Sequence, residues 1–299
     1  MSNDPSLINP ALSVVSEVER EGLAQLSTLV SPYEVVLLPA VRLASAVNLN
    51  HSGLSRQAYS QALVSGASVL IAQGSYLRPI LALDFDQSLL EVLFPNREAQ
   101  AKGEICRRLG LPLWRATPSS LISPMFKRDL DLLLTEACDQ WQSGGDPPVD
   151  RRRGLLCNAG ERRTLDILEP IVERYGFQVL VKPQLMRVLQ GSGEPPLRSL
   201  CDYAARAEVD FQIVDEAFAP VMSLEFDELA HLYDELIIAR DMKKKMLCDL
   251  DPTAWSPQRI FAEHLDADDD GMTPLERIVV SWLDLVGELK AGQQWRAAA

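Results

Sequence analysis

Hydrophobic and polar positions follow the same order of patterns twice along the chain. The spacing of apolar residues predicts a helix over 13–30 and another over 160–175. In the second of these segments, the apolar residues at helical spacing are Leu165, Leu168, Ile171 and Val172. Each predicted helix opens one half of the chain, so the pattern indicates two units of similar construction.

Three strand-like runs follow each predicted helix. They cover residues 33–43, 66–73 and 78–86 in the first half and residues 177–189, 208–215 and 219–227 in the second. A charged helix is then predicted at about 96–109 and at about 228–248. The first half closes with a probable fourth strand at 110–117, for which we expect no counterpart in the second half. The second half ends in an amphipathic helix with Ile278, Trp282, Leu285 and Leu289 on one face.

The strand-like runs can be paired between the halves at a nearly constant distance. The offset is 144 residues from Pro39 to Pro183, 142 from Ser68 to Asp210 and 141 from Asp84 to Glu225. A slowly drifting offset is what small loop deletions in a duplicated domain would produce. The fold class that we expect is α/β, with two tandem domains that each contain a mixed sheet flanked by helices.

Length and composition agree with this division. The 299 residues suggest two domains, which we place at 1–140 and 157–299. Residues 141–156 form the expected linker, because SGGDPPVDRRRG (143–154) is rich in glycine, proline and charge.

Charge and apolar content exclude several classes of protein. The net charge is −13, with 29 basic against 42 acidic residues, which argues against a polybasic protein that coats DNA. No apolar run approaches the length of about 18 residues that a membrane span needs. The N-terminus lacks the pattern of a secretory signal, and the five cysteines include no CxxC pair. We therefore expect a cytoplasmic protein with reduced thiols and no membrane partner.

The candidate chemistry lies in carboxylates of the second half. Asp210 belongs to one strand-like run, and Glu225 and Asp227 belong to the next. Because residues i and i+2 of a strand face the same side, Glu225 and Asp227 point one way, and an adjacent strand could bring Asp210 beside them. Converging carboxylates repel one another unless a cation neutralises them, and oxygen ligands favour Mg²⁺, Mn²⁺ or Ca²⁺. His231 follows Asp227 by four residues and could act as an acid or base.

The ordered pattern Asp210, Glu225-Phe-Asp227, His231 and Arg240-Asp241-xx-Lys244 resembles a PD-(D/E)XK restriction-endonuclease-like domain. More narrowly, it is similar to a bacterial family of unknown function related to very-short-patch-repair endonucleases. The segments CNAGERRTLDIL (157–168) and VKPQL also resemble the lead-in of that family. The likeness covers residues 157–248 well and residues 17–117 more faintly.

The resemblance implies a role for each matching residue. Asp210 and Glu225 would be metal ligands, and Asp227 would stand where the wider superfamily has a lysine. His231 would assist proton transfer, and Lys244 would face a phosphate. Glu161 matches a further acidic position on the first helix.

The same transfer fails in the first half. Ser68 replaces Asp210 and Leu90 replaces His231, whereas Asp84 and Asp86 persist. The first half therefore resembles a degenerate nuclease domain.

Two functions follow from these observations. The first is a nuclease dependent on Mg²⁺ or Mn²⁺ that hydrolyses phosphodiester bonds, with DNA as its expected substrate and the C-terminal copy carrying the site. The alternative is a non-catalytic pseudo-nuclease that binds a protein or a nucleic acid. The net charge, the missing lysine of the wider motif and the absent last strand favour the alternative. A positive rim around Asp210 would favour the nuclease.

Two further segments admit more than one interpretation. LDADDDGMTPLER (265–277) resembles half of a calcium loop, but Arg277 stands where that loop needs a glutamate. The better prediction is a helix start at Pro274 with a capping box from Thr273 to Glu276. Lys243, Lys244 and Lys245 are either a solvated helix face or a phosphate anchor.

Overall fold

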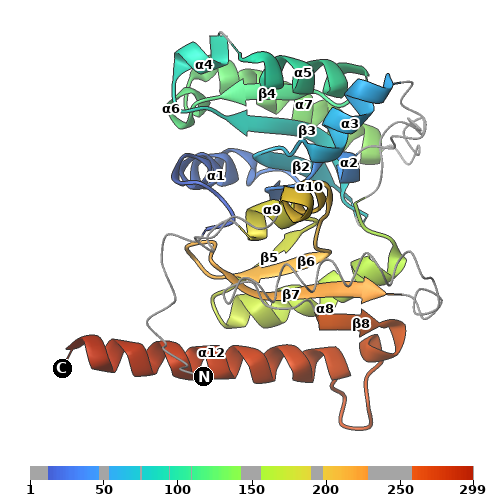
Figure 1. Cartoon of the computed structure of the whole chain (residues 1–299), viewed down its shortest axis with the longest axis vertical. Coiled ribbons are helices and arrows are strands. Elements are labelled where there is room, and N and C mark those ends of the chain that lie inside the picture. The colour runs from blue at the N-terminus through green and yellow to red at the C-terminus, as the bar shows by residue number, and fades with distance from the viewer. Residues whose placement is uncertain are drawn as a thin grey trace. The chain divides into compact units, whose positions relative to one another are not determined.

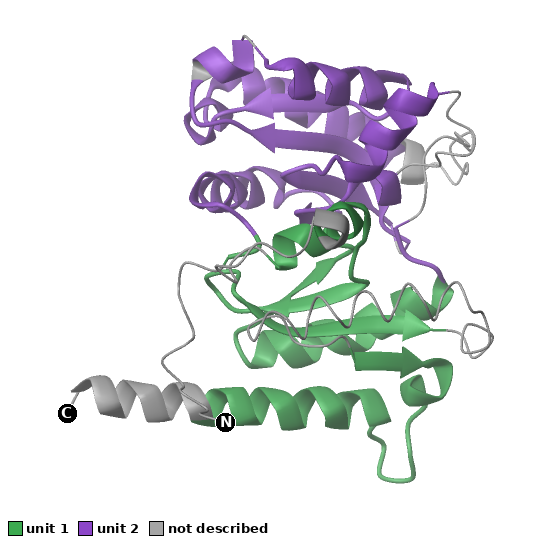
Figure 2. Cartoon of the chain, viewed as in Figure 1, with its two compact units in different colours: residues 1–14, 159–299 green, residues 15–158 purple. Residues whose placement is uncertain are grey.

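The computed structural model describes residues 13–46, 54–74, 76–93, 95–108, 110–142, 156–189, 198–227 and 258–298. The chain forms two compact units, which Figure 2 distinguishes by colour. The N-terminal unit is Val15–Asn158, and the C-terminal unit is Ala159–Ala299 together with Met1–Val14. Ser13 and Val14 join the C-terminal unit by hydrogen bonds to the turn before β7 (Pro220–Asp227), where Ser13 Oγ and Val14 N donate to the carbonyls of Ala217 and Phe218.

The N-terminal unit is built on a four-stranded sheet in the order β1-β2-β3-β4. The first three strands are antiparallel to their neighbours and β4 is parallel to β3. In chain order its elements are α1 (Glu17–Val30), β1 (Val35–Pro39), α2 (Leu43–Ala46), α3 (Arg56–Val64), β2 (Val69–Gln73), β3 (Arg78–Phe85), α4 (Leu89–Leu93), α5 (Arg97–Arg108), β4 (Leu113–Ala116), α6 (Pro118–Leu121) and α7 (Pro124–Gln142).

The C-terminal unit repeats this topology with the sheet β5-β6-β7-β8, in which β8 is parallel to β7. Its elements are α8 (Ala159–Arg174), β5 (Gln178–Val181), α9 (Leu185–Val188), α10 (Arg198–Arg206), β6 (Phe211–Val214), β7, β8 (Gln258–Phe261), the 3₁₀ helix η4 (Ala262–Leu265) and α12 (Pro274–Ala298). Two mixed sheets flanked by helices confirm the coarse fold class (Figure 1).

The expectation that the second half lacks a fourth strand is wrong. β8 pairs in parallel with the end of β7, from Leu224 opposite Gln258 to Asp227 opposite Phe261. Sequence patterns missed this strand because it has only four residues, of which Gln258 is exposed and Arg259 is charged. A short edge strand of this kind has no room for an alternating pattern.

Equivalent hydrogen bonds fix how the two units correspond. Ala40 N donates to Ser68 O in one unit, and Lys182 N donates to Asp210 O in the other. Ala40 and Lys182 also share a left-handed backbone, with φ of 60° and 52°. The offset is therefore 142 residues at both strands, and the proposed match of Pro39 with Pro183 was two residues out.

Local sequence explains where the helices begin. Ser16 and Glu19 form a capping box at α1, where Ser16 N donates to the Glu19 carboxylate and Ser16 Oγ accepts from Glu19 N. Thr273 and Glu276 do the same at α12, so the capping box predicted there is confirmed. Arg277 forms ion pairs with Asp268 and Asp270 of the preceding loop. Arginine thus neutralises this acidic loop.

Each sheet is covered by helices that pack through apolar faces. β2 is buried at every position, from Val69 to Gln73. In the C-terminal unit, α8 contacts β5, β7 and α12, and Trp282 of α12 donates its indole N–H to Val221 O of β7. The helices between the first two strands of each unit, α2 with α3 and α9 with α10, were not predicted from sequence.

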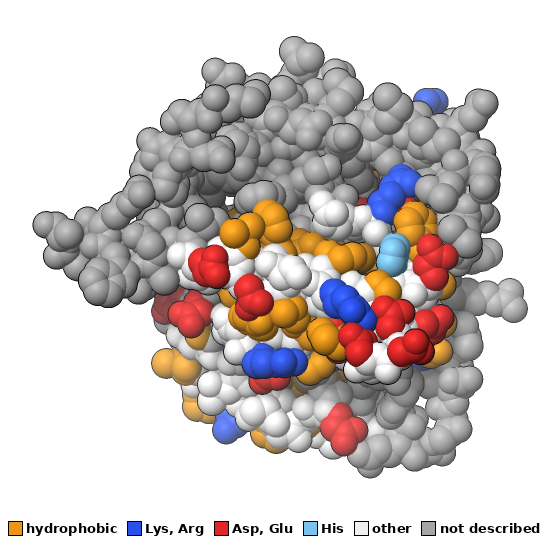
Figure 3. Space-filling view, turned by 90° about the horizontal axis from the view of Figure 1, so that it is seen from below, with side chains coloured by type: hydrophobic (Ala, Val, Ile, Leu, Met, Phe, Trp, Pro, Cys, Tyr) orange, Lys and Arg blue, Asp and Glu red, His pale blue; other side chains and the backbone are white. Residues whose placement is uncertain are grey.

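The face of the C-terminal unit that carries α12 is mixed in character. Figure 3 shows hydrophobic side chains along the described part of this face and acidic side chains gathered toward one end. Ile278 and Leu285 of α12 are partly exposed, at 37% and 45%. In the part of the chain that the structure describes, no helix combines the length and apolar character needed to cross a membrane.

A close approach between a helix and a strand recurs in both units and is testable. A Cβ at Gly160 would lie 2.2 Å from Phe226 Cζ, and one at Gly22 would lie 2.6 Å from Phe85 Cζ. We expect Gly160→Ala and Gly22→Ala each to lower the free energy of unfolding by about 1–3 kcal/mol, because the ring must move. Urea unfolding followed by circular dichroism measures this change.

Gly103→Ala is the matched control, since a Cβ there would meet nothing within 4 Å. In the open helix position it should stabilise by about 0.5–1 kcal/mol through helix propensity. Equal effects at Gly103 and Gly160 would contradict the assigned packing.

Candidate active site

Strand pairing in the C-terminal unit creates a polar corner at the end of β5 and the start of β6. Lys182 directly follows β5, and Asp210 directly precedes β6. The backbone bond from Lys182 N to Asp210 O, 2.9 Å long, ties the two residues together. Their side chains are therefore brought to one place by the antiparallel pairing itself.

The Lys182 ammonium joins two carboxylates at this corner. Its Nζ donates to Glu161 Oε1 of α8 at 2.5 Å and also to Asp210 Oδ1. The second oxygen of Asp210, Oδ2, accepts from Phe226 N of β7 at 2.9 Å. Glu161, Lys182 and Asp210 are each only 8% exposed. We call these three residues the lysine corner.

Electrostatics keep the Lys182 ammonium charged. Burial acts to lower the pKa of Lys182, but the carboxylates of Asp210, Glu208 and Glu161 outweigh it and hold that pKa above its usual value. Three carboxylates thus act on one ammonium, so negative charge is in excess around the lysine corner.

The register places Glu225 beside Asp210. Phe211 pairs with Leu224, so Asp210 and Glu225 are the next residues along the two antiparallel strands. The Asp210 carboxylate bonds to the backbone of Phe226, the residue that follows Glu225. Of the predicted site residues, Asp210 and Glu225 are therefore neighbours in the sheet.

Asp227 has a different environment from Asp210. Its Oδ2 lies 3.3 Å from Nε of Arg259 on β8, and its side chain is 7% exposed. The N-terminal unit has the same pair, Asp86 of the chain segment after β3 with Arg115 of β4. We call these two ion pairs the strand clamps, because each joins the parallel strands of its sheet. Asp227 therefore has a structural partner in the described part of the site.

Two predicted site residues, His231 and Lys244, lie outside the described residues. Lys244 is 142 positions after Lys102, the same offset that relates Ala40 to Lys182. In the N-terminal unit, Lys102 of α5 contacts Asp84, which is the counterpart of Glu225.

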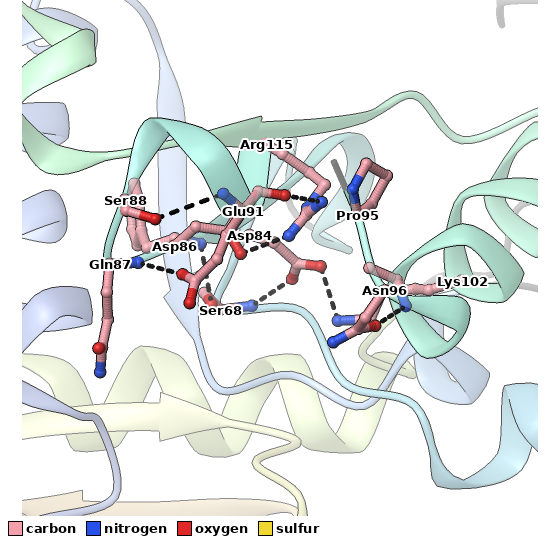
Figure 4. A network of polar contacts seen from close by, with 12 residues as sticks. Ser68, Asp84, Asp86, Gln87, Ser88, Glu91, Pro95, Asn96, Lys102 and Arg115 are labelled. Carbon is pink, nitrogen blue, oxygen red and sulfur yellow. Dashed lines mark hydrogen bonds and ion pairs between the residues drawn. The ribbon is translucent and has the colours of Figure 1, made fainter. Parts of the chain in front are cut away.

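The N-terminal unit has rebuilt the equivalent corner, as Figure 4 shows. Ala40 replaces Lys182, and Ser68 replaces Asp210, with Ser68 Oγ now accepting from Phe85 N at 3.2 Å. Asp84 accepts from Ser68 N, and Lys102 Nζ donates to Asp84 Oδ2 and to Gly66 O, both at 2.7 Å. One carboxylate and one ammonium balance there.

Burial also affects the N-terminal clamp. It raises the pKa of the Asp86 carboxyl, while the hydrogen bond and charge of Arg115 oppose that rise. Arg115 additionally donates to Glu91 O of α4 at 2.7 Å. This clamp therefore ties the helix after β3 to the sheet.

The oxygen donors of the lysine corner are of the kind that Mg²⁺ and Mn²⁺ prefer. Their excess of negative charge also favours a cation. Among the residues that the structure describes, however, no three His, Cys, Asp or Glu side chains form a group that could hold a metal ion. The lysine corner thus fits such an ion by chemistry, with Lys182 bonded to two of the donors.

Sequence reasoning missed Lys182 and Arg259. Lys182 lies within VKPQL, where a single charged residue follows a buried β-branched run, and that position was a usable signal. Arg259 could have been found by matching it to Arg115 in the first half. That match required the missing fourth strand.

No protein-family model, curated protein or solved structure matches the chain.

The strand clamps generate a stability prediction. Asp227→Asn and Asp86→Asn should each lower the free energy of unfolding by about 1–3 kcal/mol, because each leaves a partly buried arginine without its carboxylate. Thermal and urea unfolding of the folded variants measure the loss. Glu104→Gln is the control, since Glu104 pairs with Arg107 and Arg108 on the surface of α5 and should cost no more than about 0.5 kcal/mol. Unchanged stability in Asp227→Asn would remove the clamp assignment.

Proposed function

We propose that the C-terminal unit is a metal-dependent nuclease that hydrolyses phosphodiester bonds, with DNA as its expected substrate. The observation that carries the proposal is the lysine corner, where Glu161, Lys182 and Asp210 meet beside Glu225. The wider endonuclease-like motif calls for a lysine near its carboxylates. Lys182 supplies one from a different strand, in direct contact with Asp210.

Each residue has a role that its position supports. Asp210 and Glu161 would hold Mg²⁺ or Mn²⁺ through carboxylate oxygens, with Glu225 as the neighbouring ligand. When bound, such an ion supplies a Lewis acid and lowers the pKa of a water molecule. Lys182 carries a fixed positive charge at the same place, which favours a phosphate. Asp227 orients β8 through Arg259 rather than binding the ion.

The N-terminal unit is proposed to be the non-catalytic copy. Its corner has Ala40 and Ser68 at the positions of Lys182 and Asp210. Glu19, which lies 142 residues before Glu161, is used to cap α1 instead. A single carboxylate paired with Lys102 has no charge left to attract a second cation.

A second function is favoured by the pairing of charges around the lysine corner. Arg162 and Arg163 of α8 form ion pairs with Asp166 and Asp266, and Lys182 already neutralises part of the corner. Cations that are paired in this way attract a phosphate backbone less strongly. The alternative is therefore a non-catalytic pseudo-nuclease that binds a protein or a nucleic acid.

The experiment is cleavage of single-stranded DNA, double-stranded DNA and RNA with Mg²⁺ or Mn²⁺. Mutations of mere supporting residues around metals cost about 10–100-fold, so Asp210→Asn should lower the cleavage rate at least about 100-fold. Chelation should abolish cleavage by the wild type.

Asp84→Asn in the N-terminal unit is the matched control and should retain the wild-type rate. Circular dichroism confirms that both variants are folded. Absence of cleavage by the wild type on all three substrates, with binding of one of them retained, would favour the pseudo-nuclease. Equal rates in wild type and Asp210→Asn would refute the assigned site.

A further inference from the structure

Both units place a lysine ammonium against the carboxylates at the equivalent end of their sheets. In the C-terminal unit it comes from Lys182 at the end of β5, and in the N-terminal unit it comes from Lys102 of α5. The two lysines are on different elements, yet each contacts a carboxylate beside the second and third strands. A charge requirement, rather than inheritance of one residue, explains this arrangement.

The physical reason is the cost of burying carboxylates. A largely buried carboxylate needs a cation or a proton to offset the loss of hydration. Where Ala40 is too short to supply a cation, Lys102 does so, and where Lys182 is present it takes that place itself. The ammonium is thus the resident counter-ion of each corner.

The lysine corner differs from its counterpart in how many carboxylates its ammonium serves. Lys182 bonds to Asp210 and Glu161 and is also acted on by Glu208, whereas Lys102 bonds to one carboxylate and one carbonyl. Asp210 Oδ2 is already used by Phe226 N. A cation that bridges Asp210 and Glu161 must therefore take the position of Nζ.

We infer that a divalent cation binds the lysine corner only by displacing the Lys182 ammonium, so that Lys182 holds the site closed in the absence of metal. This deepens the proposed function and rests on it for its biological use. The displacement itself is a property of metal binding and can be measured without any cleavage. It predicts weak binding by the wild type and tight binding once the ammonium is removed.

The experiment is titration of the full chain with Mn²⁺ and Mg²⁺ by calorimetry. Lys182→Met removes the competing charge and leaves its two carboxylates in place. We expect it to bind Mn²⁺ at least tenfold more tightly than the wild type. The double variant Lys182→Met with Asp210→Asn should lose that gain, because one of the bridging carboxylates is gone.

Lys102→Met is the matched control in the N-terminal unit. It removes an ammonium from the equivalent corner, but only Asp84 is left there, so no tighter Mn²⁺ binding is expected. A similar gain in Lys102→Met and Lys182→Met would show a general charge effect and overturn the inference.

Lys182→Gln serves if the methionine variant does not fold, since its amide can still donate to Asp210 and Glu161 without a charge. The wild type provides a separate readout. Saturating Mn²⁺ should increase acylation of Lys182 by an amine-reactive reagent, as quantified by peptide mass spectrometry, because the displaced side chain becomes accessible. Unchanged labelling at saturation would contradict displacement.

The outcomes separate this inference from the proposed function. Tight Mn²⁺ binding by Lys182→Met without cleavage of any substrate by the wild type would support the inference and remove the nuclease. Cleavage by the wild type with equal Mn²⁺ affinity in both proteins would keep the nuclease and overturn the inference. Absence of binding in every Lys182 variant would also overturn it.

Discussion

The site of this protein depends on the pairing of the first strand of each unit with the second. One residue beyond the first strand, the backbone turns left-handed and donates to the residue just before the second strand. This hydrogen bond brings position 182 next to position 210, and position 40 next to position 68. Everything else at the two corners follows from which side chains occupy those positions, because the backbone is the same in both units.

Charge balance decides what each corner can do. The lysine corner has an ammonium among three carboxylates, so it is both stabilised by Lys182 and left with negative charge in excess. The N-terminal corner has lost the aspartate and the lysine of the first two strands and is balanced by Lys102 and Asp84. The strand clamps, by contrast, persist in both units. Residues kept in both copies therefore support the fold, and residues found in one copy mark the candidate chemistry.

Much of this architecture could be predicted from the sequence, since the repeated order of helices and strands follows from hydrophobic spacing. Asp210 and Glu225 were also expected to be neighbours, and the strand register makes them so. The short strand β8 and the clamp through Arg259 could not be predicted, because four residues carry no readable period. The role of Lys182 depends on a backbone turn and on contacts from α8 and β6. A long-range arrangement of that kind leaves only an isolated charge in the sequence.

The measurement that tests the central claim most directly is anomalous diffraction at the manganese edge from crystals grown with Mn²⁺. The account predicts an anomalous peak between the carboxylates of Asp210 and Glu161, with the Lys182 side chain moved away from both. No peak at the lysine corner at a Mn²⁺ concentration that supports cleavage, or a peak confined to the N-terminal unit, would contradict the account.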